Sequence, residues 1–129
     1  MLEISHLMVA EGPRPVAPFS HAVRAGDFLF VTGQMPTSPV THEIVGDDVV
    51  AQTRQVVENL VTVLSGAGLT LERTVFARVY LTDFARDYAA MNDYWQSLFE
   101  PGKLPGRTCV GVTGLALGAL VEIDLIAAC

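Results

Sequence analysis

Residues 119–128, ALVEIDLIAA, predict the central strand of a β-sheet. Apolar side chains alternate along one face of this strand, and Leu120 and Ile126 add apolar groups to the other face. The alternating set consists of Val121, Ile123, Leu125 and Ala127. A strand that is apolar on both faces needs both of them covered. We therefore expect this strand to lie in the middle of the sheet, with protein packed against each face.

The rest of the chain predicts further strands. A tight turn at Ala25-Gly26-Asp27 separates two short segments with the pattern of β-strands and so predicts a hairpin. Proline and glycine make residues 11–20 and 35–47 irregular. The strands expected from the pattern are 21–24 and 28–32, which form the hairpin, and then 74–82, 107–113 and 119–128.

Two segments between the strands show helical spacing. The first follows a capping aspartate, Asp47 or Asp48, and the second follows Asp83 or Asp87. Apolar residues recur at steps of three and four in both, and we expect them to pack into the core. They are Val49, Thr53, Val56, Leu60 and Leu64 in the first helix, and Tyr88, Met91, Trp95 and Leu98 in the second. These elements predict a single domain over residues 1–129 that combines helices and strands.

The composition predicts that this domain associates with other copies. Half of the 129 residues are hydrophobic, 17% are charged, and the mean hydropathy is +0.39. Two helices can cover only one face of a sheet, so the other face of the central strand needs a partner. Self-association through the sheet is the simplest way to bury it.

Charge and cysteine content exclude several classes of protein. The net charge is −6, and the eight basic residues are scattered, so we expect no binding of nucleic acid. No apolar run is long enough to span a membrane, and the N-terminus does not resemble a signal peptide. The two cysteines, Cys109 and Cys129, form no disulfide framework. A soluble, cytoplasmic protein with free thiols is expected.

Two charged residues interrupt the apolar pattern. Glu122 lies inside the predicted central strand, where an unpaired carboxylate costs several kcal/mol. It therefore either reaches a hydrated cavity or pairs with a cation such as Arg78. Arg107 follows Leu104-Pro105-Gly106 at the start of a strand, and its guanidinium can grip a carboxylate through two hydrogen bonds. We expect Arg107 to hold a small anionic substrate.

Other motifs indicate structure rather than chemistry. Cys109 lies on the same side of its strand as Arg107, but no histidine stands in a recognisable relation to it, so a buried core thiol is favoured over a nucleophile. His6, His21 and His42 lack the spacing of metal ligands, and no metal site is expected. The glycines at 111–118 precede no helix and no Gly-Lys-Ser/Thr, which excludes a phosphate-binding loop.

Several stretches in order resemble one known family. APFSHAV (17–23) is similar to its GPYSQAV, FVTGQMP (30–36) to its FVSGQIP, and AQTRQVVENL (51–60) to its first helix. PGRTCVGV (105–112) and LVEIDLIA (120–127) are similar to PARSxVxV and VEIEAIA. Over nearly its full length the chain resembles the RidA/YjgF family of enamine/imine deaminases.

This resemblance implies a chorismate-mutase-like α+β fold, with a mixed six-stranded sheet and two helices on one face. It implies a homotrimer with clefts between subunits. By position, Arg107 would bind the substrate carboxylate and Glu122 would position the hydrolytic water, fifteen residues apart across a strand–loop–strand unit. Gly33, Asn92 and Cys109 would line the cleft.

The implied activity is hydrolysis of 2-imino acids such as 2-iminopropionate, or of their enamine tautomers, to 2-oxo acids and ammonia, without cofactor or metal. The family's tyrosine in GPYSQAV is Phe19 here, so one hydroxyl is lost from the substrate-binding set. That favours, as an alternative, a dedicated catabolic deaminase of a larger enamine such as 2-aminomuconate. A trimer that binds a small carboxylate without catalysis is the third hypothesis.

Overall fold

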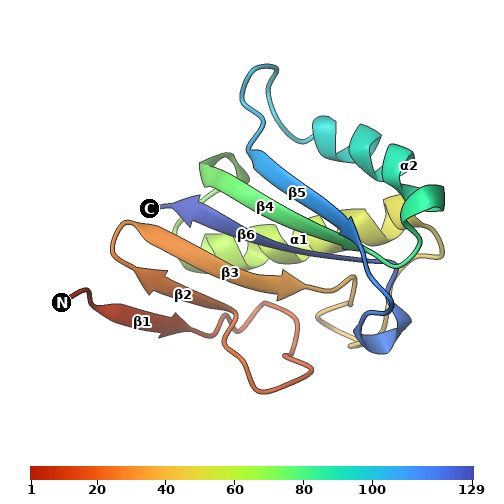
Figure 1. The fold of residues 1–129 in the computed structure, drawn as a ribbon. Coiled ribbons are helices and arrows are strands. Elements are labelled where there is room, and N and C mark those ends of the chain that lie inside the picture. The colour runs from red at the N-terminus through yellow and green to blue at the C-terminus, as the bar shows by residue number, and fades with distance from the viewer.

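The computed structural model describes all 129 residues, which form a mixed sheet of six strands with two helices (Figure 1). The strands lie in the order β1-β2-β3-β6-β4-β5. β5 runs parallel to β4, and every other neighbouring pair is antiparallel. The strands are β1 (Ile4–Leu7), β2 (Ala22–Ala25), β3 (Phe28–Gln34), β4 (Thr74–Leu81), β5 (Gly106–Gly111) and β6 (Val121–Ala128).

The expected central strand is confirmed as β6, which lies between β3 and β4. Its alternation is complete, because every second side chain from Val121 to Ala127 is buried and the residues between them are half-buried. β2 and β3 form the expected hairpin around Gly26, whose φ of 60° is the left-handed conformation that glycine adopts without strain.

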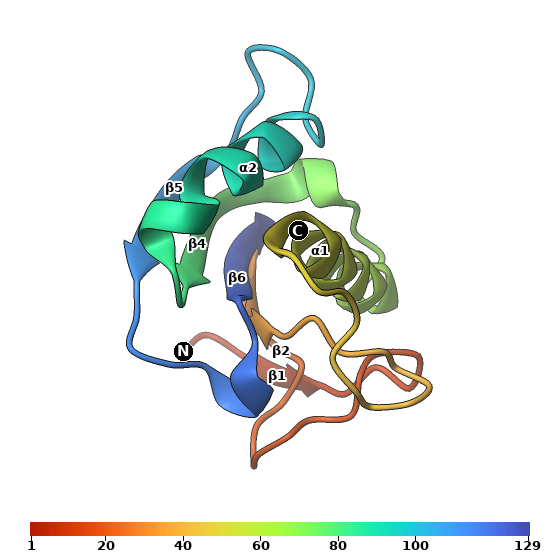
Figure 2. The ribbon, with the colours of Figure 1, turned by 90° about the vertical axis from the view of Figure 1, so that its right-hand side faces the viewer.

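The two helices lie on the same side of the sheet (Figure 2). α1 (Val49–Gly66) begins at Asp48, whose carboxylate accepts a hydrogen bond from the Ala51 amide. α2 (Phe84–Gln96) begins at Asp83, which accepts one from the Arg86 amide. Apolar residues from both helices and from strands β2, β3, β4 and β6 form one buried cluster, so the helices cover the central part of this face. Neither helix is long and apolar enough to cross a bilayer.

Three details differ from the sequence pattern. β1 was not among the expected strands, since its side chains are largely exposed and no apolar alternation distinguishes it. Simple alternation with the buried Ala77 and Val79 would place Val75 in the core, but Val75 is exposed, because the pairing of β4 with β6 shifts between Thr74 and Phe76. The expectation that Tyr88 packs into the core is wrong, since its side chain is exposed.

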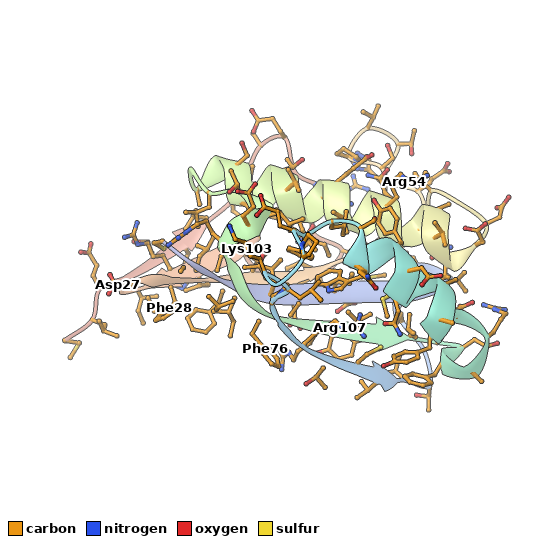
Figure 3. The ribbon with its side chains drawn as sticks, turned by 90° about the horizontal axis from the view of Figure 1, so that it is seen from above. Asp27, Phe28, Arg54, Phe76, Lys103 and Arg107 are labelled. Atoms are coloured by element: carbon orange, nitrogen blue, oxygen red, sulfur yellow. The ribbon has the colours of Figure 1, made fainter.

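The other face of the sheet has no helix over it. Figure 3 shows Phe28 and Phe76 on the side of the sheet away from the helices. With Phe30 these rings are 37–46% exposed, which is a large apolar area for an isolated chain. Within one chain, this face is therefore uncovered, as expected from a sequence with only two helices.

Candidate functional site

Arg107 is held at the edge of the sheet by α2. It lies on β5 and points to the helix side, next to α2 (Figure 3). One guanidinium nitrogen donates to Asn92 Oδ1 at 2.6 Å, and the other lies 3.6 Å from Met91 Sδ. The guanidinium carbon lies over the Tyr88 ring, 6.0 Å from its centroid. These contacts fix the direction of the guanidinium before any ligand binds.

The three α2 residues meet Arg107 because of their helical spacing. Positions 88, 91 and 92 are three and four residues apart and so share one side of the helix. Met91 is buried and anchors that side in the core. Tyr88 stacks in turn on Phe84, with ring centroids 4.5 Å apart. Tyr88 is a contact that the sequence pattern missed, because helical spacing does not distinguish a core aromatic from one that supports a surface cation.

Cys109 lies on the same side of β5 as Arg107, as strand alternation predicts. It is half-buried and packs against the core. Burial raises the pKa of its thiol, and the charge of Arg107 opposes this only in part. A thiol with a raised pKa is a poor source of thiolate, which agrees with the expectation that Cys109 is not a nucleophile.

Glu122 lies on the opposite face of the sheet. It pairs with Tyr80 across β4 and β6, and that pair alternates with the buried residues that face the helices. Burial raises the pKa of the Glu122 carboxyl above its usual range, and the nearby charge of Asp124 raises it further. Within the chain, no hydrogen bond or ion pair neutralises this carboxylate.

Gly33 leaves the space that Glu122 occupies. A Cβ built on Gly33 would overlap the Glu122 carboxylate, with the Glu122 Cγ at only 3.2 Å. The pairing of β3 with β6 shifts between Val31 and Gln34, next to this contact. Two of the residues that the resemblance assigned to the site, Gly33 and Glu122, therefore touch one another.

The possible ion pair between Glu122 and Arg78 does not form. Arg78 Nε instead donates to Asp124 Oδ1 at 2.8 Å, and the Tyr80 hydroxyl donates to Asp124 Oδ2 at 3.0 Å. Asp124 thus takes both donors on this face. Glu122 is left as the half-buried acid without a partner.

Phe19 belongs to the loop between β1 and β2 and is exposed. It borders a small hollow that Gly33 also lines. The buried imidazole of His21 holds the base of this loop: Nδ1 accepts from the Val9 amide at 2.9 Å, and Nε2 donates to the Pro13 carbonyl at 2.6 Å. This fixing role of His21 had no signal in the sequence beyond the residue type.

The expected site residues therefore form two groups in one chain. Arg107, Asn92 and Cys109 lie together on the helix side, at the β5 edge. Glu122 and Gly33 lie together near β3, on the uncovered side, with Phe19 near Gly33. The strand–loop–strand connection does not bring Arg107 and Glu122 together, because their side chains leave the sheet on opposite faces. No group of three or more His, Cys, Asp or Glu side chains is gathered anywhere as a metal-ligand set.

Comparison with known proteins gives consistent matches over almost the whole chain. Residues 9–129 match the family described as Endoribonuclease L-PSP. A RutC family protein of Pyrococcus horikoshii is 41% identical over 94% of each chain. The 3-aminoacrylate deaminase RutC of Acinetobacter baylyi is 35% identical, over 94% of this chain and 95% of that one. The crystal structure of YyfA from Yersinia pestis, of the Rid protein family, superposes with a TM-score of 0.92 at 33% identity, over 98% of this chain and 100% of that one.

Proposed function

Because the chain belongs to the Endoribonuclease L-PSP family, which includes the Rid and RutC proteins, we propose that it hydrolyses 2-imino acids or their enamine tautomers to 2-oxo acids and ammonia. The family membership confirms the resemblance seen in the sequence. The observation that supports the activity best is Arg107, a guanidinium oriented by Asn92, Met91 and Tyr88 in an otherwise acidic chain.

The chemistry requires little from the protein. A protonated imine is already electrophilic at its carbon. Arg107 would hold the substrate carboxylate next to the imine carbon. Glu122 would take a proton from a water molecule as the water oxygen bonds to that carbon. Glu122 then returns its proton to the amino nitrogen of the resulting carbinolamine, the C–N bond breaks, and ammonia leaves. The carbonyl of the 2-oxo acid forms as the hydroxyl proton passes to the Glu122 carboxylate and from there to solvent. No electron transfer takes place.

The positions of the two groups support a site shared between subunits. A substrate with a few carbon atoms cannot contact side chains that leave one sheet on opposite faces. A neighbouring copy that laid its β5 edge and α2 against the uncovered face would place its Arg107 next to this chain's Glu122 and would cover Phe28, Phe30 and Phe76. Such a contact joins two different surfaces and closes into a ring, which we propose is a trimer with three clefts.

The activity is tested with 2-iminopropionate, produced from alanine by an amino-acid oxidase and trapped by semicarbazide. The wild type should clear the imine faster than spontaneous hydrolysis. Because a charged hydrogen bond contributes about 1.5–3 kcal/mol, Arg107→Ala should lower kcat/KM by about tenfold to a few hundredfold. Arg107→Lys keeps the charge but cannot form two parallel hydrogen bonds to a carboxylate, so its kcat/KM should lie between those of the wild type and Arg107→Ala. Equal, slow clearance by wild type and Arg107→Ala would contradict deamination of this substrate.

The shared site is tested by mixing two inactive variants. Arg107→Ala and Glu122→Gln are co-expressed with different tags, and mixed oligomers are purified. If each site takes one residue from each of two neighbouring subunits, every mixed trimer should contain one restored site among its three, so about a third of the wild-type activity per trimer should return. A site within one chain predicts no recovery. Oligomers of two differently tagged Arg107→Ala chains are the matched control, and they should stay inactive.

Phe19 favours a second candidate substrate. It replaces a hydroxyl-bearing ring by a wholly apolar one beside Gly33. A dedicated deaminase of a larger enamine such as 2-aminomuconate would use that surface. The relative in Acinetobacter baylyi is itself named for a specific enamine, 3-aminoacrylate. Ranking kcat/KM over a panel of imines and enamines separates the general from the dedicated deaminase, and binding of 2-oxobutyrate without turnover of any of them would indicate a ligand-binding trimer instead.

The family description names an endoribonuclease, which the charge of this chain does not favour. Binding to RNA depends on clustered basic side chains that neutralise phosphates. Here the net charge is −6, and Arg107 is the basic residue of the proposed site. We therefore place the activity on small carboxylates rather than on polynucleotides.

A further inference from the structure

Three polar residues surround Glu122 on the uncovered face of the sheet. Tyr80 is its direct partner across β4 and β6, and Arg78 pairs in the same way with Asp124. Asp124 is two residues along β6 and therefore shares the face of Glu122. On the other side, β3 (Phe28–Gln34) carries no titratable residue. Arg78, Tyr80 and Asp124 are thus the titratable groups that face Glu122 from its own strand and from the strands on either side.

The Asp124 carboxylate is fixed in position. Arg78 Nε binds one oxygen at 2.8 Å, and the Tyr80 hydroxyl binds the other at 3.0 Å. The Asp124 side chain is only 17% exposed, so water screens its charge less than that of a surface carboxylate. Burial and the bond to Asp124 raise the pKa of Tyr80, which keeps its hydroxyl protonated and able to donate. The cluster therefore holds a localised negative charge near a second, unpaired acid.

We propose that this cluster is a positioning device for Glu122, in which Asp124 makes Glu122 a stronger base and Arg78 and Tyr80 hold Asp124 in place and limit its effect. The proposal rests on the proposed function, since it is in the deamination of imines that Glu122 acts as a base. None of the three residues needs to touch the substrate.

The physical reason is repulsion between like charges at a partly desolvated site. A carboxylate that is ionised beside Asp124 gains stability when it takes up a proton, so it removes a proton from water more readily. Arg78 acts in the opposite direction, because its positive charge offsets part of the Asp124 charge. The two residues should therefore affect Glu122 with opposite signs, which a purely structural role does not predict.

Direct titration of Glu122 tests this without relying on turnover. Glutamate is labelled with ¹³C at Cδ, and Glu122→Gln identifies the Glu122 signal in the oligomer as purified. Asp124→Asn should lower the titration midpoint of Glu122 by about half a pH unit or more. Arg78→Met and Tyr80→Phe should raise it, and Arg78→Lys, which keeps the charge, should leave it close to the wild type.

The pH profile of kcat/KM for deamination should move with the titration: the acidic limb shifts to lower pH in Asp124→Asn and to higher pH in Arg78→Met. Midpoints that stay constant, or that move in the same direction in both variants, overturn the inference. If Asp124→Asn does not fold, Arg78→Met against Arg78→Lys still decides the sign. Opposite shifts in a protein without deaminase activity would support the cluster and contradict the proposed function, so the two failures are distinguishable.

Discussion

The position of the Glu122 carboxylate depends on the absence of a side chain at Gly33. The Glu122 carboxylate fills the volume in which a Gly33 side chain would stand. A change of one methyl group therefore acts directly on the Glu122 carboxylate, the proposed base, although Gly33 itself has no functional group.

Gly33→Ala should push the Glu122 carboxylate from its position. We expect kcat to fall by about tenfold or more with a folded, oligomeric protein, since a displacement on the order of 1 Å is sufficient to disturb the alignment of water and substrate. Steady-state kinetics measure the change in kcat, and circular dichroism checks that the variant is folded. Gly68→Ala, at a positive-φ helix end with open space around it, is the control for glycine replacement and should affect stability rather than kcat.

Glu122 should also reduce stability at neutral pH. Its pKa is higher in the folded chain than in the unfolded one, so its favourable contribution is fully present below the usual glutamate range and is lost as pH rises through the folded value. Glu122→Gln should remove this penalty and raise Tm at pH 7 by roughly 1–3 °C, while it abolishes the proposed activity. Thermal unfolding of the wild type and Glu122→Gln at pH 7 and near pH 4 measures the difference in Tm. An increase of the same size at both pH values would contradict a penalty from the ionised carboxylate.

At the scale of elements, α2 acts as the support for Arg107. Phe84, Tyr88 and Asn92 follow one another at four-residue steps, and the guanidinium lies against the last two. The helix was predicted from its spacing, and Asn92 from the resemblance. The support given by Tyr88 was not, because whether an aromatic residue at helical spacing faces the core or a neighbouring strand depends on how the helix is rotated.

Tyr88→Ala should loosen Arg107 without removing it. We expect KM for the imine to rise by about threefold to tenfold, because a cation–π contact of roughly 0.5–1 kcal/mol is lost together with the packing that orients the guanidinium. Tyr88→Phe keeps the ring and should behave like the wild type. If Tyr88→Phe were as impaired as Tyr88→Ala, the hydroxyl rather than the ring would be the functional part.

At the scale of the whole molecule, the uncovered face connects the fold with the site. It carries Glu122 and Gly33, and it also carries exposed phenylalanine rings on β3 and β4. A partner that covers these rings would at the same time bring a second set of residues to Glu122. Assembly and activity should therefore be lost together.

Phe30→Glu should prevent the proposed assembly by placing a charge in the apolar face, where burial of an unpaired carboxylate costs several kcal/mol. Light scattering coupled to size-exclusion chromatography should report a monomer near 13.9 kDa with little deaminase activity. Val61→Glu is the matched control, since Val61 is equally exposed but lies on α1, on the other side of the sheet. An active Phe30→Glu monomer would contradict a site shared between subunits.

The sequence by itself determined the order of the elements from β2 onward, the central place of residues 119–128 and the need to cover both faces of that strand. These follow from local periodicity, capping residues and the number of helices available, all of which are properties of neighbouring residues. Arg107 and Glu122 stood out as charged residues in an apolar pattern, whereas Gly33, Asn92 and the lining role of Cys109 came from the family resemblance.

Only the tertiary structure decided which of those residues meet. It paired Arg78 with Asp124 instead of Glu122, placed Gly33 against Glu122, and sent Arg107 and Glu122 to opposite faces of the sheet. The reason is physical: strand register and helix rotation are set by packing between segments far apart in the chain, and a shift of one residue reverses the face on which a side chain lies.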